Sequence, residues 1–225
     1  MLDHLKKAEQ KAEELFHEIK TRGIILPNKF ESQVNEEIYC LAKEIFGIDK
    51  YWHKRIVRAG LNTLAPYKEN PEDLIIQEDD MVFLDFGPLI DDFEADFGRS
   101  YVIGGDPEKV TLCLNIENAW YDIQRWVKVQ KELGNCLKSN SLFEHCIKVA
   151  NSYGYSFGGG IAGHLIGKYP HESLEPGDFG LYIHPANELN IFSLNEKMEK
   201  RHWILELHFV HSSKKFAAFF EQLLC

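Results

Sequence analysis

The sequence predicts an α+β fold, in which helical segments alternate with antiparallel pairs of strands. Apolar residues recur at helical spacing over residues 3–22 and 32–46, and a long helix is expected over residues 107–134. Residues 81–102 and 203–224 each have the pattern of a strand, a turn and a second strand. These observations together favour a mixed fold with helices and antiparallel pairs.

The length and composition fit one soluble globular domain. The chain has 225 residues, of which 44% are hydrophobic and 27% are charged. We expect a single domain over residues 1–225, with a helical N-terminal portion over about residues 1–60 and a core over about residues 75–225.

The two N-terminal helices each carry one apolar stripe. In the first, Gly23 follows the last helical residue and is expected to end the helix. In the second, Ser32 is the expected N-cap. The expected buried residues are Leu5, Ala8, Ala12, Leu15, Phe16 and Ile19 in the first helix and Val34, Ile38, Leu41, Ala42 and Ile45 in the second.

The middle of the chain contains residues that typically form turns and cap helices. Asp106 is the expected cap of the long helix, with Pro107 at its first position. Another helix is expected from Ser141 to near Gly154. Residues 47–80 are mixed, and residues 172–201 are rich in loop residues with one strand expected near 181–184.

The net charge limits the kinds of partner to be expected, and the cysteines indicate the cellular compartment. The formal net charge of −10 argues against nucleic acid or an anionic membrane as a partner, because both select basic patches. No apolar run reaches the length of about 20 residues that a membrane span needs. The five cysteines are widely spaced and odd in number, which is typical of reduced thiols, so we expect a cytoplasmic protein without a secretory leader.

The first strand pair places two aspartates close together. If its turn centres on Ile90 and Asp91, then Asp85 and Asp96 lie directly opposite each other. Opposed residues on antiparallel strands point to the same face, with Cβ atoms about 5 Å apart. Two carboxylates in that position repel each other.

The second strand pair repeats the arrangement with glutamates. If its turn centres on Ser213 and Lys214, then Glu206 and Glu221 lie opposite each other. Both pairs have apolar flanks, and a buried carboxylate is costly without a compensating cation. A pair of divalent metal ions would resolve both the repulsion and the burial, whereas the alternative is that the four acids are solvated strand residues.

The candidate metal ligands occur in a particular order along the chain. Asp85 and Asp96 are eleven residues apart, and His164 stands in a Gly-His-Leu-Ile-Gly segment. The chain resembles the metallopeptidase family of methionine aminopeptidase, aminopeptidase P and prolidase in the order and setting of Asp85, Asp96, His164, His171, Glu206 and Glu221.

The resemblance implies that residues 1–225 form a single catalytic domain with a metal-binding core over about residues 75–225. It implies the pita-bread fold, with two similar halves whose antiparallel strand pairs surround a central dinuclear metal site. It implies that Asp85 holds one metal, that Asp96 and Glu221 bridge both, and that His164 and Glu206 complete the other. Oxygen-rich ligation with one imidazole suits Mn²⁺, Co²⁺, Fe²⁺ or Zn²⁺.

The resemblance also implies an activity and roles for individual side chains. We expect a peptidase that hydrolyses short peptides or removes an N-terminal residue, with proline-directed cleavage as the first choice. Glu206 is expected to shuttle the proton of the attacking water, and His171 to donate to the substrate carbonyl. His208 faces the same side of its strand as Glu206 and is expected to line the cleft and contact substrate. A peptide is thus the expected partner, and the sequence leaves open a homodimer.

The chain departs from the family at one position. Aminopeptidases of this family usually carry a histidine about eighteen residues before the first aspartate, and here Tyr67 occupies that place. The nearest upstream histidine is His53. Either substrate handling differs, or His53 approaches the site from another direction. Two alternative functions stay open, namely another C–N hydrolase of creatinase type and a metal-free peptide-binding module.

Overall fold

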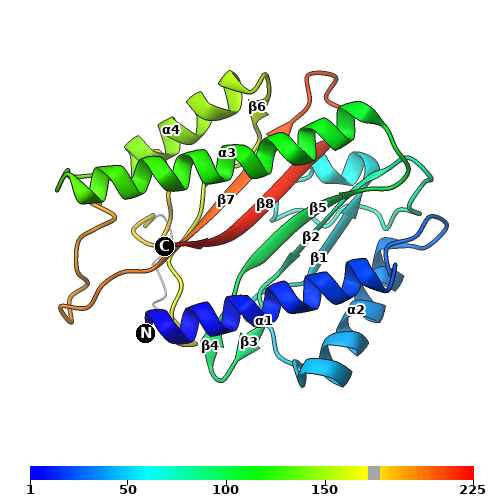
Figure 1. Ribbon diagram of the computed structural model, residues 1–225, viewed down its shortest axis with the longest axis horizontal. Helices are drawn as coiled ribbons and strands as arrows, with labels where there is room; N and C mark the ends of the chain where they lie inside the picture. Colours follow the sequence, from blue (N-terminus) through cyan, green and yellow to red (C-terminus); the bar gives the residue numbers. More distant parts are fainter. Residues whose placement is uncertain (172–177) are drawn as a thin grey trace.

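A six-stranded antiparallel sheet forms the centre of the protein in the computed structural model, which describes residues 1–171 and 178–225 (Figure 1). The strand order is β1-β2-β5-β8-β7-β6, and a short hairpin of β3 and β4 extends from β2 and β5. The strand bounds are Ile56–Ala59 (β1), Met81–Phe86 (β2), Leu89–Ile90 (β3), Phe93–Glu94 (β4), Phe97–Val102 (β5), Ser156–Phe157 (β6), Trp203–Val210 (β7) and Ala217–Leu224 (β8).

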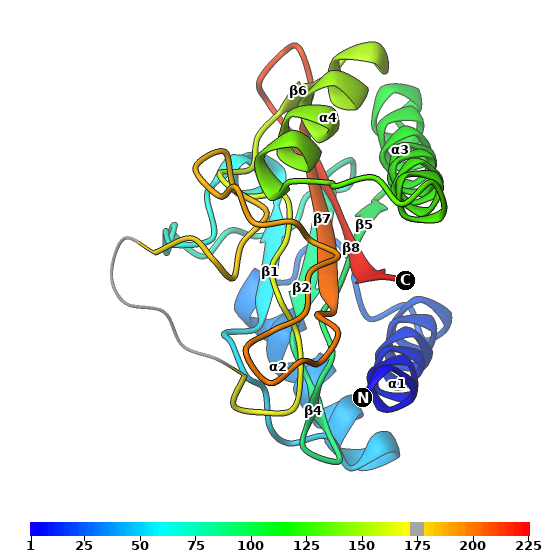
Figure 2. The same ribbon diagram turned by 90° about the vertical axis from the view of Figure 1, so that its left-hand side faces the viewer.

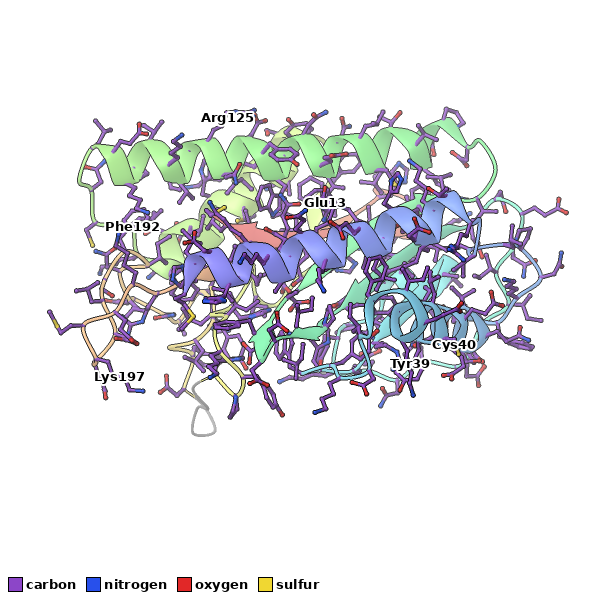
Figure 3. All side chains as sticks on the ribbon, turned by 60° about the horizontal axis from the view of Figure 1, so that its bottom comes forward. Glu13, Tyr39, Cys40, Arg125, Phe192 and Lys197 are labelled. Carbon is purple, nitrogen blue, oxygen red and sulfur yellow. The ribbon has the colours of Figure 1, made fainter. Side chains whose placement is uncertain are left out.

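The long helices α1 and α3 cover one face of the sheet. The helix bounds are Leu2–Thr21 (α1), Glu31–Phe46 (α2), Pro107–Glu132 (α3) and Ser139–Ser152 (α4), with a 3₁₀ helix, η1, over Gly60–Leu64. Figure 2 shows α1 and α3 on one side of the sheet and the coil between β6 and β7 on the other. Charged side chains such as Arg125 of α3 point away from the sheet (Figure 3). The mixed α+β architecture expected from the sequence is confirmed.

Each half of the sheet has its own hydrophobic core. One core joins α1 and α2 to β1 and β2, around side chains such as Phe16 and Phe86. The other joins α3 and α4 to β7 and β8, around Trp120 and Phe209. The Trp120 indole N–H donates to the Leu205 carbonyl oxygen at 2.8 Å, so its one polar atom is satisfied inside the core.

The helix predictions hold with small shifts at the ends. All six predicted stripe residues of α1 are buried, and Asp106 accepts hydrogen bonds from the first-turn amides of α3. In α2 the prediction of Ser32 as N-cap is wrong, because Phe30 is the cap and the Gln33 side chain accepts from its backbone N–H at 2.8 Å. Ile45 was expected to be buried and is 40% exposed, because it lies on the last turn of α2. Helix α4 begins at Ser139, two residues before Ser141.

The first hairpin differs from the predicted register by two residues. Asp85 pairs with Gly98, and Ile90 pairs with Phe93, so the turn centres on Asp91 and Asp92. Both turn residues have positive φ, 52° and 65°, which aspartate tolerates far better than the β-branched Ile90 would. A shift of two residues keeps side chains on the same face, so Asp85 and Asp96 still share one side of the sheet.

The second hairpin has the predicted register. Glu206 pairs with Glu221, and the chain reverses at Ser213 and Lys214. Alternate residues of β7 separate cleanly, because Leu205, Leu207 and Phe209 enter the core while the residues between them face the opposite side.

Three elements were not predicted from the sequence. Strands β1 and β6 are short edge strands, and η1 follows β1 directly. The strand expected near 181–184 is only a single bridge, between Tyr182 and His164. Part of the loop-rich segment 172–201, namely residues 172–177, lies outside the described residues.

The two halves of the sheet join between β5 and β8. Gly98 pairs with Glu221, and the Ser100 hydroxyl both accepts from the Phe219 N–H at 2.7 Å and donates to its carbonyl oxygen at 3.0 Å. On the helix-covered face, the Arg99 guanidinium lies 3.8 Å from the rings of Phe97 and of Phe220, and it donates to the Glu221 carbonyl oxygen. These contacts fix the position of Glu221 relative to β5.

The structure also shows whether any helix could span a membrane and how the cysteines are placed. Among the described residues, no helix combines the length and the apolar character needed to cross a bilayer. All five cysteines are free, and Cys146 is fully buried in the core of α4, as a small apolar residue would be.

Glu9 provides a test of how α1 packs on the sheet. Its carboxylate accepts from the Leu223 N–H at 2.6 Å, and burial raises its pKa to about 7. Because the folded-state pKa exceeds that of the unfolded chain, stability falls as the pH rises from about 4.5 through 7. Glu9→Gln keeps the acceptor and removes this loss, so the variant should gain about 1–3 kcal/mol relative to wild type between pH 4.5 and pH 8.

Urea unfolding of both proteins at the two pH values measures this difference. Glu14→Gln, an exposed change on the same helix, is the control and should show no such gain. A pH-independent difference between Glu9→Gln and wild type would contradict the packing of α1 against β8.

Candidate metal centre

The predicted donor residues meet on the face of the sheet opposite α1 and α3. Asp85 lies on β2, Asp96 directly before β5, and Glu206 and Glu221 on the paired strands β7 and β8. His164 lies in the coil that covers this face and bridges to Tyr182. Residues from four parts of the chain therefore converge on one position.

Interatomic distances show how closely these groups approach. The Nε2 atom of His164 is 3.0 Å from Asp96 Oδ2 and 3.9 Å from Glu221 Oε1. Glu206 is paired with Glu221 across β7 and β8, so the two carboxylates lie next to each other. Asp85 interacts electrostatically with both Asp96 and Glu206. The structure thus brings together all five residues that the sequence nominated as metal ligands.

Gly163 allows His164 to reach the carboxylates. It has φ of 136°, and a Cβ atom at this position would lie 2.0 Å from the Ile204 carbonyl oxygen. The next residue returns to β7, since the Ile204 N–H donates to the His164 carbonyl oxygen at 2.8 Å. A glycine is therefore required at this position both for conformation and for space.

His53 is a sixth side chain in this cluster. Its Nε2 atom is 3.1 Å from Asp96 Oδ1 and 3.6 Å from Asp85 Oδ1, and its side chain is 7% exposed. Of the two options that the sequence left open, the structure shows the second, in which His53 approaches from another direction. The Tyr67 ring, at the family's usual histidine position, lies 6.0 Å from the His53 ring.

Glu94 is a site residue that sequence reasoning missed. It is 1% exposed, and its carboxylate accepts from His171 Nδ1 at 2.7 Å and from the Gly167 N–H at 3.0 Å. This contact fixes the orientation of the His171 ring, which lines the cleft. A signal was present in the sequence, because Glu94 lies two residues before Asp96 within the same strand-turn-strand segment.

His208 lies two positions beyond Glu206, on the same face of β7. Its Nε2 atom is 2.8 Å from the Thr63 carbonyl oxygen, to which it donates, and burial lowers its pKa. Its ring contacts Phe83 and Phe219 at centroid distances of 6.1 and 6.3 Å. The residue therefore lines the cleft next to an apolar patch.

Burial and mutual repulsion dominate the electrostatics of the cluster. Desolvation raises the pKa of Asp85 to about 7, with the Asp96 charge adding to the rise, and it raises the pKa of Glu221 well above its usual value. Burial also opposes the ionisation of Asp96, but the His53 and His164 imidazoles outweigh it and lower the pKa of that carboxyl. Asp96 is therefore the carboxylate that both imidazoles stabilise.

The residues present fit a pair of divalent cations. Two groups of three donors have their ligand atoms within 4.8 Å of one another, namely His53, Asp85 and Asp96, and Asp96, His164 and Glu221. Glu221 Oε2 is buried and has no hydrogen-bond partner among the described residues. Carboxylates and imidazoles are ligands that suit Mn²⁺, Fe²⁺, Co²⁺ and Zn²⁺, and a cation would offset both the desolvation and the repulsion.

A cleft of about 610 Å³ opens above the cluster. Its floor includes all five predicted ligands together with His53, and its walls include His171, His208, the glycines at 158–160 and several aromatic side chains. A cleft of this size is sufficient for a short peptide or a similar small molecule.

The sequence profile of metallopeptidase family M24 matches residues 3–203 of the chain. The chain belongs to metallopeptidase family M24. The matched range includes Asp85, Asp96 and His164, so three of the five candidate ligands fall inside it.

Solved structures of several peptidases share the fold of this M24 chain. A prolidase from Thermococcus sibiricus superimposes with a TM-score of 0.68 and 21% identity, over 98% of this chain and 54% of the prolidase. An X-Pro aminopeptidase from Thermotoga maritima gives 0.73 and 19%, over 98% and 56%. A methionine aminopeptidase from Thermotoga maritima gives 0.72 and 15%, over 97% and 90%.

These likenesses confirm the predicted pita-bread fold of the M24 chain. The chain spans about half the length of the prolidase and X-Pro aminopeptidase structures, and most of the length of the methionine aminopeptidase. A search of curated protein sequences finds no match.

Replacing Glu221 should have opposite effects with and without metal. Without metal at pH 8, Glu221→Gln removes a buried carboxylate whose pKa is raised, so the variant should be more stable than wild type by about 1–3 kcal/mol. With saturating Zn²⁺ or Mn²⁺ the order should reverse, because the variant loses a ligand and therefore loses stabilisation by binding.

Thermal or urea unfolding with chelator and with added metal measures both effects. Glu196→Gln, an exposed change of the same type, is the control and should behave as wild type in both conditions. Equal stabilisation of wild type and Glu221→Gln by metal would contradict the role of Glu221 as a ligand.

Proposed function

We propose that the chain is a dinuclear metal-dependent peptidase that hydrolyses short peptides or removes an N-terminal residue. The observation that carries this proposal is the pair of three-donor groups that share Asp96 at the floor of the cleft. Metal-ion pairs of this kind are common in hydrolases, including aminopeptidases. Membership of a metallopeptidase family supports the same reaction class.

The roles of the side chains follow from their positions. In the proposed centre, Asp85 would hold one cation, Asp96 and Glu221 would be shared by the two, and His164 and Glu206 would complete the second. Two divalent cations bound there would polarise the scissile carbonyl and lower the pKa of the attacking water. Glu206 would then accept the proton of that water and deliver it to the leaving amine, a role that fits its position among the residues lining the cleft.

His171 is proposed to donate a hydrogen bond to the substrate carbonyl. Its Nδ1 atom is held by Glu94, so the opposite edge of the ring can face the cleft. A donor fixed in this way needs no rearrangement as negative charge develops on the carbonyl oxygen. The partnership of Glu94 and His171 thus positions a group for transition-state stabilisation.

A proline-directed preference is part of the proposal. Ile56, Phe83 and Phe219 form a small buried apolar cluster that borders the cleft beside His208. An apolar wall of this kind suits a compact ring such as pyrrolidine, and several structural neighbours carry the names prolidase or X-Pro aminopeptidase. The proposal also includes a cytoplasmic location and leaves open a homodimer.

A peptide library with Mn²⁺, Co²⁺ or Zn²⁺ tests the function and separates it from the two alternatives. A peptidase releases new amino termini, and a creatinase-type enzyme cleaves C–N bonds only in non-peptide substrates. A metal-free binding module binds peptides without hydrolysis and purifies without stoichiometric metal. The proposal expects hydrolysis that chelator abolishes, fastest for peptides with proline next to the cleaved bond.

Asp96→Ala should abolish hydrolysis. Because Asp96 belongs to both three-donor groups, its loss removes a ligand from each cation. Loss of several kcal/mol of transition-state stabilisation corresponds to a fall of at least about 1,000-fold in kcat/KM. Metal content by elemental analysis should fall with it, while circular dichroism stays native. Unchanged turnover would contradict the assignment.

His171→Ala should affect turnover without affecting metal content. Loss of one donor to the developing oxyanion costs about 100- to 1,000-fold in kcat, with a smaller change in KM. Glu94→Gln, which keeps the ring but weakens its orientation, should cost less. Loss of bound metal in His171→Ala would show that the histidine is itself a ligand.

A further inference from the structure

His53 and His164 each contact a different oxygen of Asp96, and the two nitrogens of each ring have the same kinds of partner. In His164, Nδ1 lies 2.8 Å from the Leu165 carbonyl oxygen and Nε2 lies 3.0 Å from Asp96 Oδ2. In His53, Nδ1 lies 2.7 Å from the Lys54 carbonyl oxygen and Nε2 lies 3.1 Å from Asp96 Oδ1. Each ring therefore donates one N–H to the carbonyl of the following residue and directs its other nitrogen at a different oxygen of the same carboxylate.

This pattern is that of a metal-binding histidine. Ligating imidazoles usually donate the second ring N–H to a backbone carbonyl or a carboxylate, which fixes the tautomer and the ring orientation. A neutral His53 with its proton on Nδ1 would direct the Nε2 lone pair at two carboxylates, Asp96 and Asp85. That contact is repulsive unless a positive charge, either a proton on Nε2 or a bound cation, lies between the nitrogen and the oxygens. His53, Asp85 and Asp96 each offer a ligand atom, and these atoms lie within 4.8 Å of one another, which is close enough for one cation to bind all three.

The sheet, rather than a free loop, fixes the position of His53. The Trp52 N–H donates to the Gly87 carbonyl oxygen at 2.9 Å, and the indole N–H donates to the Ala95 carbonyl oxygen at 2.9 Å. A Cβ atom on Gly87 would lie 2.2 Å from His53 Cδ2 and 2.4 Å from Trp52 Nε1. The absence of a side chain at Gly87 is what makes room for both rings.

The Trp52 indole contacts both imidazole rings. Its indole packs edge-on against His53 at a centroid distance of 4.5 Å and against His164 at 5.2 Å. One rigid aromatic side chain therefore orients both rings toward Asp96. The arrangement is approximately symmetric about that carboxylate, with one imidazole from each half of the fold.

We propose that His53 is a sixth protein ligand of the metal centre, with Nε2 donated to the cation that Asp85 holds. The inference rests on the proposed metal centre and extends its donor set. Each cation then has one imidazole, and both share Asp96. A second imidazole favours Zn²⁺, Fe²⁺ or Co²⁺ over the more carboxylate-preferring Mn²⁺ at that position.

X-ray absorption of the zinc-loaded wild-type protein tests the ligand count directly. With His53 and His164 both bound to metal, the average is about one imidazole per zinc, whereas the five-ligand set with His164 alone gives about one half. The lower value, with two zinc ions bound, would overturn the proposal for His53 and leave the five-ligand centre intact. A chain that binds no zinc at all would overturn both.

His53→Gln supplies an independent measurement. Isothermal titration with Zn²⁺ should show one of the two sites weakened by at least about 10-fold, with the imidazole count per zinc reduced to about one half. His184→Gln is the matched control, because His184 lines the same cleft but belongs to neither three-donor group. Thermal unfolding of the metal-free variants checks that both are folded. Two zinc sites of wild-type affinity in His53→Gln would contradict the assignment.

Discussion

Four carboxyl groups placed side by side, three of them buried and Glu206 partly buried, are the constraint on which the rest of this structure depends. Asp85, Asp96 and Glu221 are each at most 7% exposed, and Glu206 is paired directly with Glu221. Burial alone would drive such groups to take up protons, and their proximity adds repulsion. Imidazoles lower this cost at Asp96, and divalent cations would remove most of the remainder. The interior of this protein is therefore organised around negative charge that its own imidazoles offset only in part.

The fold places this charge where its two halves meet. Each half has its own hydrophobic core, which packs its strands against its own helices. The β5–β8 contact then joins them, and it does so at Gly98 and Glu221, beside the cluster. On the far face, the Arg99 guanidinium packs between two aromatic rings and binds the Glu221 carbonyl, so one residue of the seam is anchored from both sides of the sheet.

The features of the site that could be predicted are those set by interactions between residues that are close together in the sequence. The Glu206–Glu221 register follows from a tight turn between two strands of clear alternation, and the stripe of α1 follows from helical spacing. The Asp85–Asp96 register was missed by two residues because the turn requires positive φ at Asp91 and Asp92, a preference that outweighs centring the turn on Ile90. Asp85 and Asp96 still point to the same face of the sheet, because a shift of two residues does not change the side to which a side chain points.

The sequence by itself indicated which carboxylates and which histidine lie close together, and the family in which their order is found. Only the tertiary structure decided that His53 joins them and that Glu94 orients His171. His53 depends on the space left by Gly87 and on hydrogen bonds from Trp52 to two other segments. Periodicity and turn chemistry act over a few residues and can be found in a sequence, whereas a close approach between remote segments is set by packing of the whole chain.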